Sequence, residues 1–160
     1  MIQIRHTLTL LCLMLSLSVF AEPSENNWQS ITNYAFSFSI PNTLKKTDAR
    51  GIDSFAEEYR GNGLTIGFDY GIYSNSFQDW PKETTFEEAE IDGDSARIGT
   101  RANFVDQTNT WFRSQVHFKA TGRHSNLSMH AWCRSTNEFV TAKTIFKSIR
   151  FIRRSKEDNQ

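Results

Sequence analysis

The stretch WFRSQVHFKATGRHSNLSMHAWC, residues 111–133, decides the fold. Apolar and polar residues alternate along both of its halves, which is typical of two half-buried β-strands. Residues 121–124 read TGRH and separate the two halves as a turn. A turn centred there places the apolar residues of both strands on one face, which is the register that burial selects. The expected pairs are Phe118 with Leu127, Val116 with Met129, and Phe112 with Cys133.

A helix is predicted directly after this hairpin. Ser135 and Glu138 have the spacing of a capping box, in which each side chain accepts a hydrogen bond from the other residue's backbone N–H. Apolar residues then recur every three or four positions and give the helix one apolar stripe. The stripe consists of Phe139, Ala142, Phe146 and Ile149, with Ile145 beside it. We expect it to cover the apolar face of the preceding hairpin.

Further alternating runs predict more strands upstream of the hairpin. These strands are expected at residues 34–40, 55–60, 64–70, 87–91 and 95–98. Pro41 ends the first run because proline lacks a backbone N–H, while Gly61-Asn62-Gly63 and Asp92-Gly93 are turn sequences that join the later runs into hairpins. Residues 71–84 are expected to be irregular, and residues 101–109 to be a loop. The predicted fold class is therefore α+β, a mainly antiparallel sheet of hairpins with a C-terminal helix packed on one face.

This order of elements resembles the PsbP-like superfamily of α/β/α sandwiches. The residues that carry the resemblance are Phe36-Ser37-Phe38-Ser39-Ile40-Pro41 and the segment 139–151, with Ile91-Asp92-Gly93 between them. The superfamily includes thylakoid-lumen photosystem proteins and small periplasmic proteins of bacteria. The resemblance spans roughly residues 34–153 and implies the fold.

Two shorter segments, Ile52-Asp53-Ser54-Phe55 and Phe68-Asp69-Tyr70-Gly71, resemble small exported bacterial proteins without an assigned activity. Members of the superfamily mostly act as accessory or assembly factors and share no catalytic residues. The resemblance therefore implies an accessory role and transfers no site residue to this chain.

The chain starts with the pattern of a secretory signal peptide. Arg5 and His6 precede an apolar run from Leu8 to Phe20, and Val19-Phe20-Ala21 offers small residues for cleavage before Glu22. The run is shorter than the roughly 20 apolar residues of a membrane span, so we expect no stable membrane anchor after cleavage. We expect a periplasmic or secreted protein. Its organisation would be a signal peptide at 1–21, a polar leader at 22–33, a single PsbP-like α+β domain at 34–153 and a charged tail at 154–160.

Composition argues against several classes of function. The chain has 18 basic and 18 acidic side chains, and this balance gives no electrostatic reason to expect nucleic acid as a partner. Removal of the signal peptide leaves Cys133 without another cysteine, so no intramolecular disulfide is expected, and its position in the alternation makes it a small buried residue. No cofactor-binding motif, such as a glycine-rich phosphate loop, is present, and we expect no cofactor.

The histidines and serines do not predict a metal or catalytic site. His117 and His130 share the polar face of the last hairpin, but no acidic residue lies between residues 111 and 134 to complete a metal site. There is no Gly-x-Ser-x-Gly elbow and no triad-like spacing. We therefore expect neither catalytic nor metal-binding residues.

Alternative functions nevertheless remain open. Residues 83–94 are rich in Glu and Asp, and paired carboxylates there would serve a hydrolase. Much of this run surrounds the turn Asp92-Gly93, where Asp is favoured by turn geometry alone. A small exported domain is equally compatible with a periplasmic immunity protein that neutralises a toxin.

The polar face of the last hairpin carries the candidate binding residues. They are Trp111, Arg113, His117, His130 and Trp132. Exposed Trp and Arg side chains together are typical of binding hot spots. The expected function is therefore a non-catalytic accessory module that binds a protein partner through this face. The competing possibility is that the aromatic segment 71–84 folds over the face and buries it.

Overall fold

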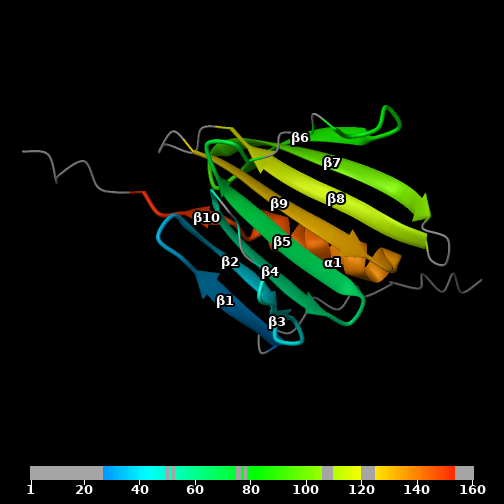
Figure 1. The fold of residues 1–160 in the computed structure, drawn as a ribbon, viewed down its shortest axis with the longest axis horizontal. Helices are drawn as coiled ribbons and strands as arrows, with labels where there is room; N and C mark the ends of the chain where they lie inside the picture. The colour runs from blue at the N-terminus through cyan, green and yellow to red at the C-terminus, as the bar shows by residue number, and fades with distance from the viewer. Residues whose placement is uncertain are drawn as a thin grey trace, which may run out of the picture.

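The computed structural model describes residues 27–49, 51, 53–74, 77, 79–105, 110–119 and 125–153 (Figure 1). The expected signal peptide, the charged tail and the turn at 121–124 lie outside these residues. The described residues form ten strands and one helix, in this order: β1 Trp28–Thr32, β2 Phe36–Pro41, β3 Lys45–Lys46, β4 Phe55–Gly61, β5 Leu64–Gly71, β6 Thr85–Ile91, β7 Asp94–Val105, β8 Thr110–Phe118, β9 Asn126–Cys133, α1 Thr136–Lys147 and β10 Arg150–Phe151. The structure is α+β and dominated by sheet. None of the described helical residues form a helix long and apolar enough to cross a membrane.

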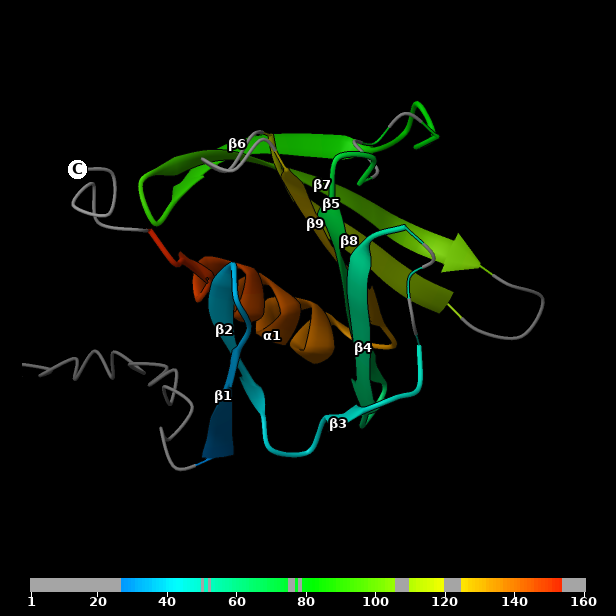
Figure 2. The same ribbon diagram turned by 60° about the vertical axis from the view of Figure 1, so that its left-hand side comes forward.

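The strands form a large and a small antiparallel sheet. The large sheet has the order β3-β4-β5-β9-β8-β7-β6, and the small sheet has the order β1-β2-β10. Figure 2 shows α1 between the two sheets, where it contacts β9, β8 and β5 on one side and β2 on the other. One face of the large sheet is therefore covered by the helix, and the other face, which we call the outer face, points away from it.

The hydrophobic core lies between the large sheet, α1 and β2. Phe68 of β5 contacts Phe36 and Phe38 of β2, with ring centroids 5.1 Å and 5.7 Å apart. Three residues of the predicted apolar stripe are fully buried, namely Ala142, Phe146 and Ile149. Burial of these side chains provides the main stabilisation, about 1.5–3 kcal/mol for each large apolar side chain.

The expected pairing of the last hairpin is confirmed. Phe118 pairs with Leu127, Val116 with Met129, and Phe112 with Cys133. The hairpins around Gly61-Asn62-Gly63 and Asp92-Gly93 are also present, as β4–β5 and β6–β7.

The helix begins at its predicted cap. The Ser135 hydroxyl accepts a hydrogen bond from the Glu138 backbone N–H, at 3.4 Å. The Glu138 carboxylate accepts from the Ser135 hydroxyl and not from its backbone N–H, so the reciprocal half of the expected capping box differs. The cap still satisfies one of the free donors at the helix start.

Two segments differ from the expectation. Within the expected polar leader, residues 28–32 form β1, which pairs with β2 through a turn held by Asn33, whose side chain accepts from the Ala35 and Phe36 N–H groups. The apolar residues of β1, Trp28 and Ile31, are three positions apart and therefore give no alternation.

The loop expected at 101–109 is the second difference. β7 continues through residue 105, and β8 begins at residue 110. Its pairing with β8 shifts register between Arg101 and Phe104, and such an irregularity breaks the period of two on which the prediction depended. Residues 106–109 lie outside the described part of the chain.

Candidate binding site

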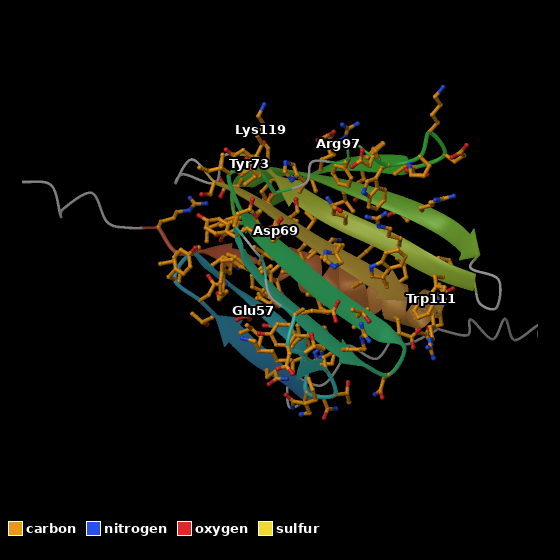
Figure 3. The ribbon with its side chains drawn as sticks, viewed as in Figure 1. Glu57, Asp69, Tyr73, Arg97, Trp111 and Lys119 are labelled. Carbon is orange, nitrogen blue, oxygen red and sulfur yellow. The ribbon has the colours of Figure 1, made fainter. Side chains whose placement is uncertain are left out.

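The outer face gathers the predicted site residues, because side chains two apart on a strand point to the same side. Trp111, Arg113 and His117 come from β8, and His130 and Trp132 come from β9. Figure 3 views the large sheet from the side opposite α1 and shows Trp111 near one end of this face. The parity predicted from the sequence is therefore present in the structure.

Cross-strand pairing builds one row of cationic and aromatic side chains across this face. Trp132 pairs with Thr65 of β5 on one side and with Arg113 of β8 on the other. Arg60 of β4 pairs with Thr65, and Arg101 of β7 pairs with Arg113, which completes the row. Neighbouring positions in a sheet bring side chains within about 5 Å of one another, so these groups share one environment.

Arg113 lies against two indole rings. Its guanidinium carbon is 4.5 Å from the ring centroid of Trp80 and 5.1 Å from that of Trp132. Burial and, to a lesser extent, the charge of Arg101 lower the pKa of Arg113. Within the part of the chain that the structure describes, the buried Nε of Arg113 and the buried Nε1 of Trp80 have no hydrogen-bond acceptor. Buried polar groups normally have a partner, so two unpaired buried donors beside each other are unusual.

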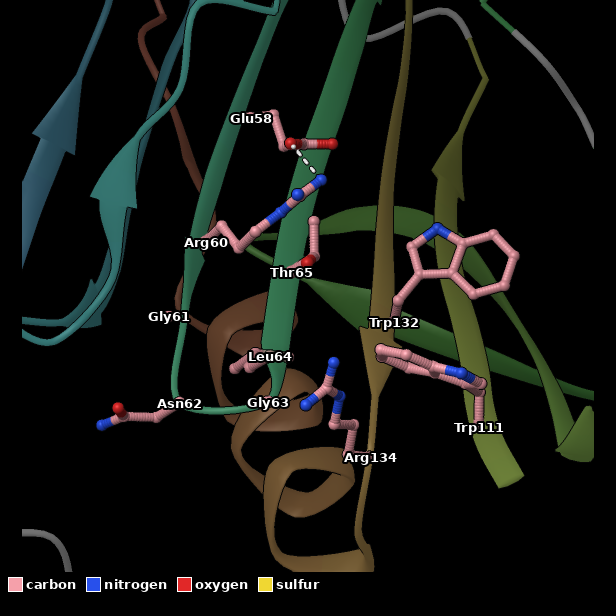
Figure 4. A pocket seen from close by; sticks show the side chains of 10 residues that line it. All are labelled: Glu58, Arg60, Gly61, Asn62, Gly63, Leu64, Thr65, Trp111, Trp132 and Arg134. Atoms are coloured by element: carbon pink, nitrogen blue, oxygen red, sulfur yellow. Dashed lines mark hydrogen bonds and ion pairs between the residues drawn. The ribbon is translucent and has the colours of Figure 1, made fainter. Parts of the chain in front are cut away.

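A pocket of about 580 Å³ opens beside this row (Figure 4). Trp132 and Trp111 line the pocket next to each other. Arg134, the residue directly after β9, also lines it. The guanidinium carbon of Arg134 is 4.9 Å from the ring centroid of Trp111. The full lining is Glu58, Arg60, Gly61, Asn62, Gly63, Leu64, Thr65, Trp111, Trp132 and Arg134.

The β4–β5 turn closes one end of the pocket. Asn62 and Gly63 both have positive φ angles, 46° and 77°, which is the geometry of a tight hairpin turn. The carbonyl oxygen of Gly63 accepts a hydrogen bond from the backbone N–H of Arg134, at 3.1 Å. This bond ties the turn to the start of the helical segment and fixes Arg134 at the pocket rim.

Ser74, Phe77 and Trp80 of the segment at 71–84 lie over the middle of the outer face, as the competing possibility proposed. Phe77 is buried, and its ring lies above Gly99, where a Cβ would be only 2.6 Å from it. The Phe77 ring also contacts His117, with centroids 6.1 Å apart.

A hydrogen-bonded chain fastens the same segment to the sheet. The hydroxyl groups of Ser74 and Ser128 are 3.2 Å apart, and the Ser128 hydroxyl is 2.8 Å from Nδ1 of His117. All three side chains are buried. Burial and, second, the charge of Lys119 lower the pKa of His117. His117 therefore belongs to the packing beneath this cover.

His130 occupies a hollow made by a glycine. Its ring lies across Gly67 so closely that a Cβ there would be 2.5 Å from His130 Nε2. Burial is the main cause that lowers its pKa, followed by the charge of Arg113, while Glu58 and Asp69 act in the opposite direction. His130 does not line the pocket.

Of the predicted residues, then, Trp111 and Trp132 line the pocket and Arg113 adjoins it, whereas both histidines belong to the centre of the face. The strand parity also predicted Arg134 on this face, and Trp80 belongs to the aromatic segment at 71–84, but neither was among the candidate binding residues; Arg60 and Arg101 were missed. The β4–β5 hairpin that carries Arg60 was predicted, but the pairing of β5 with β9, which brings Arg60 to the row of Trp132, was not.

Other candidate chemistry finds little support. The described residues contain no group of three His, Cys, Asp or Glu side chains placed to hold a metal ion. Burial, and then Glu138, raises the pKa of Cys133 to about 12, so the buried thiol stays protonated. In the acidic run, Glu87 pairs with Lys143 at 3.0 Å and Glu88 with Arg97 at 3.2 Å.

Comparison with known proteins gives a likeness in structure only. No protein-family model matches the chain, and no curated protein matches its sequence. The solution structure of cyanobacterial PsbP (CyanoP) from Synechocystis sp. PCC 6803 is similar to it, with a TM-score of 0.53. The chain has a PsbP-like fold. The alignment covers 79% of this chain and 93% of that PsbP chain at 14% sequence identity, so the likeness establishes the fold and no more.

Proposed function

We propose that this chain is an exported, non-catalytic accessory protein that binds a protein partner through the pocket on its outer face. The observation that carries the proposal is the pocket of about 580 Å³ lined by Trp111, Trp132 and Arg134. Trp and Arg are the residues most enriched at the centres of protein interfaces, because they combine a large contact area with hydrogen-bond donors. A pocket of this size accommodates a peptide segment or a few side chains of a partner.

The structural likeness to cyanobacterial PsbP supports the proposal at the level of the fold. The sequence resemblance to small exported bacterial proteins and the signal-peptide pattern at 1–21 support export to the periplasm or beyond. An accessory role agrees with a site that offers binding groups and lacks an activated nucleophile.

The alternative, a hydrolase that uses the carboxylates at 83–94, requires Glu87 and Asp94 to face each other in a cleft. Glu87 instead pairs with Lys143 of α1, and Asp94 lies 3.5 Å from Arg153. These ion pairs favour a structural role for the acidic run. An immunity protein is a further alternative, and a toxin gene beside the gene for this chain would identify it.

Site-specific photo-cross-linking in the native envelope tests the proposal. A benzophenone amino acid replaces Arg60, whose exposed side chain stands at the pocket rim, and a control chain carries it at Val140, exposed on α1. We expect discrete protein adducts from position 60 that are absent from position 140 and disappear when Trp132→Ala is added. Identical adducts from both positions, or none from position 60, would contradict the proposal.

A further inference from the structure

We propose, on the basis of the function above, that the pocket and the adjoining Arg113 bind an acidic, extended segment of the partner protein. The site consists of Arg113 and Trp80 at one end, Trp132 in the middle, and Trp111 with Arg134 at the other end. The charge, the hydrogen-bond donors and the shape of the site all favour such a segment.

Charge complementarity selects an anionic ligand. Arg60, Arg101, Arg113 and Arg134 surround the site. Among the residues that line the pocket, Glu58 is the acidic one, and it pairs with Arg60 at 3.1 Å. Arg101 and Arg113 are direct cross-strand neighbours of like charge, so both add positive charge to this end of the site.

The free donors select a carboxylate in particular. A guanidinium that stacks on indole rings uses the faces of its plane, while its N–H groups point outward in the plane and fit the two oxygens of a carboxylate. Arg113 and Arg134 both stack in this way, on Trp80 and Trp132 and on Trp111.

The aromatic surface and the strand order select an extended segment. Trp111 and Trp132 stand on neighbouring strands of the outer face, and the site runs along β8 and β9, from Arg113 and its partner Trp132 to Trp111 and Arg134. Carboxylates on alternate residues of an extended chain are about 6.5–7 Å apart, which lets successive acidic side chains meet successive stacked arginines. The indole rings then cover the residues between them.

The probe is a blocked peptide in which Glu alternates with Ala, compared with matched peptides that carry Gln or Lys in place of Glu. The readout is the set of indole N–H signals of the ¹⁵N-labelled mature protein. The chain has 4 tryptophans, and Trp28 in the small sheet serves as an internal reference. We expect the Glu peptide to shift the signals of Trp80, Trp111 and Trp132 but not that of Trp28, and to bind more weakly at 0.5 M salt, where charges are screened.

Variants of the arginines test the contacts. Arg134→Gln is expected to weaken binding of the Glu peptide about tenfold or more, as is Arg113→Gln, since each removes a charge-assisted pair. Arg97→Gln is the matched control because Arg97 also stacks on an aromatic ring of the outer face, that of Phe86 at 4.1 Å. The control is expected to bind within twofold of the original protein. Should Arg113→Gln fail to fold, Arg134→Gln at the open pocket rim still decides the question.

The outcomes separate this inference from the proposed function. Equal binding of the Glu and Gln peptides overturns the acidic specificity, and equal shifts with sodium acetate at the same carboxylate concentration overturn the extended peptide. If cross-linking at position 60 captures a partner while the Glu peptide does not bind, the accessory function stands and this inference fails. If the Glu peptide binds while no partner is captured, the specificity of the pocket for an acidic, extended segment stands and the proposed function fails.

Discussion

At the scale of single residues, glycines on the outer face decide which rings can lie flat against the sheet. Gly67 faces His130 across the β5–β9 pair, and Gly99 accepts the ring of Phe77. Alanine at either position would overlap with a ring, although alanine is otherwise at least as favourable as glycine in a strand. The sequence shows the glycines, but the rings that cover them come from strands and segments far away in the chain.

Gly67→Ala is therefore expected to destabilise the protein by roughly 1–3 kcal/mol, the usual cost of overpacking. In the His130→Ala background the same change is expected to be neutral or stabilising, because the ring that the new methyl group would meet is gone. Urea denaturation of the two single variants and the double variant measures this coupling. Additive effects of the two substitutions would show that the His130 ring does not occupy the hollow.

The buried His117 predicts a dependence of stability on pH. Because burial lowers its pKa in the folded state, the unfolded chain binds the proton more readily below the ordinary value of about 6.5. The free energy of unfolding should therefore be independent of this group above pH 6.5 and fall as the pH decreases below it. Denaturation at pH 7.5 and pH 5 should show a smaller decrease for His117→Gln than for the original protein. The same measurement on His130→Gln shows how much of the decrease comes from His130, because the pKa of that histidine is lowered as well. An equal decrease in the original protein and in His117→Gln would exclude His117 as a source of the effect.

At the scale of elements, the last hairpin and the helix were predictable because their signals are local. Strand alternation fixed the pairs from Phe118 with Leu127 to Phe112 with Cys133, and the spacing of Ser135 and Glu138 located the helix start. β1 and the end of β7 were not predictable, since the first has apolar residues at an odd spacing and the second contains a register shift.

The pocket was predictable only in part. Trp111, Trp132 and Arg134 follow from parity, whereas Arg60 joins them through the non-local pairing of β5 with β9.

The contact of α1 with the large sheet predicts a large effect for one substitution. Phe146→Ala should reduce the free energy of unfolding by about 3–5 kcal/mol, because the side chain is fully buried. Val140→Ala on the exposed side of the same helix is the control and should change stability by about 0.5 kcal/mol or less. A loss below about 1 kcal/mol for Phe146→Ala would mean that the helix does not depend on this contact.

At the scale of the whole molecule, the two faces of the large sheet differ: the helix-covered face forms the core, and the outer face carries the candidate binding site. The first is apolar and holds the two sheets together through α1, while the second combines a covered centre with an open, cationic and aromatic end.

The export proposed for this chain has its own test. Material secreted to the envelope should begin at Glu22, and its intact mass should show the loss of residues 1–21. A mass that retains this segment, or that carries a lipid on Cys12, would contradict the expected export.

Binding of the partner is proposed to depend on the pocket lined by Trp111 and Trp132. The most direct test is the affinity of the original protein and of pocket variants for the cross-linked partner, once that partner is purified. Calorimetric titration should show that Trp132→Ala binds at least about tenfold more weakly than the original protein, as expected for a hot-spot residue. Trp132→Phe, which keeps an aromatic ring, should lose less. Circular dichroism and thermal unfolding establish that both variants are folded. An unchanged affinity of a folded Trp132→Ala variant would contradict the account.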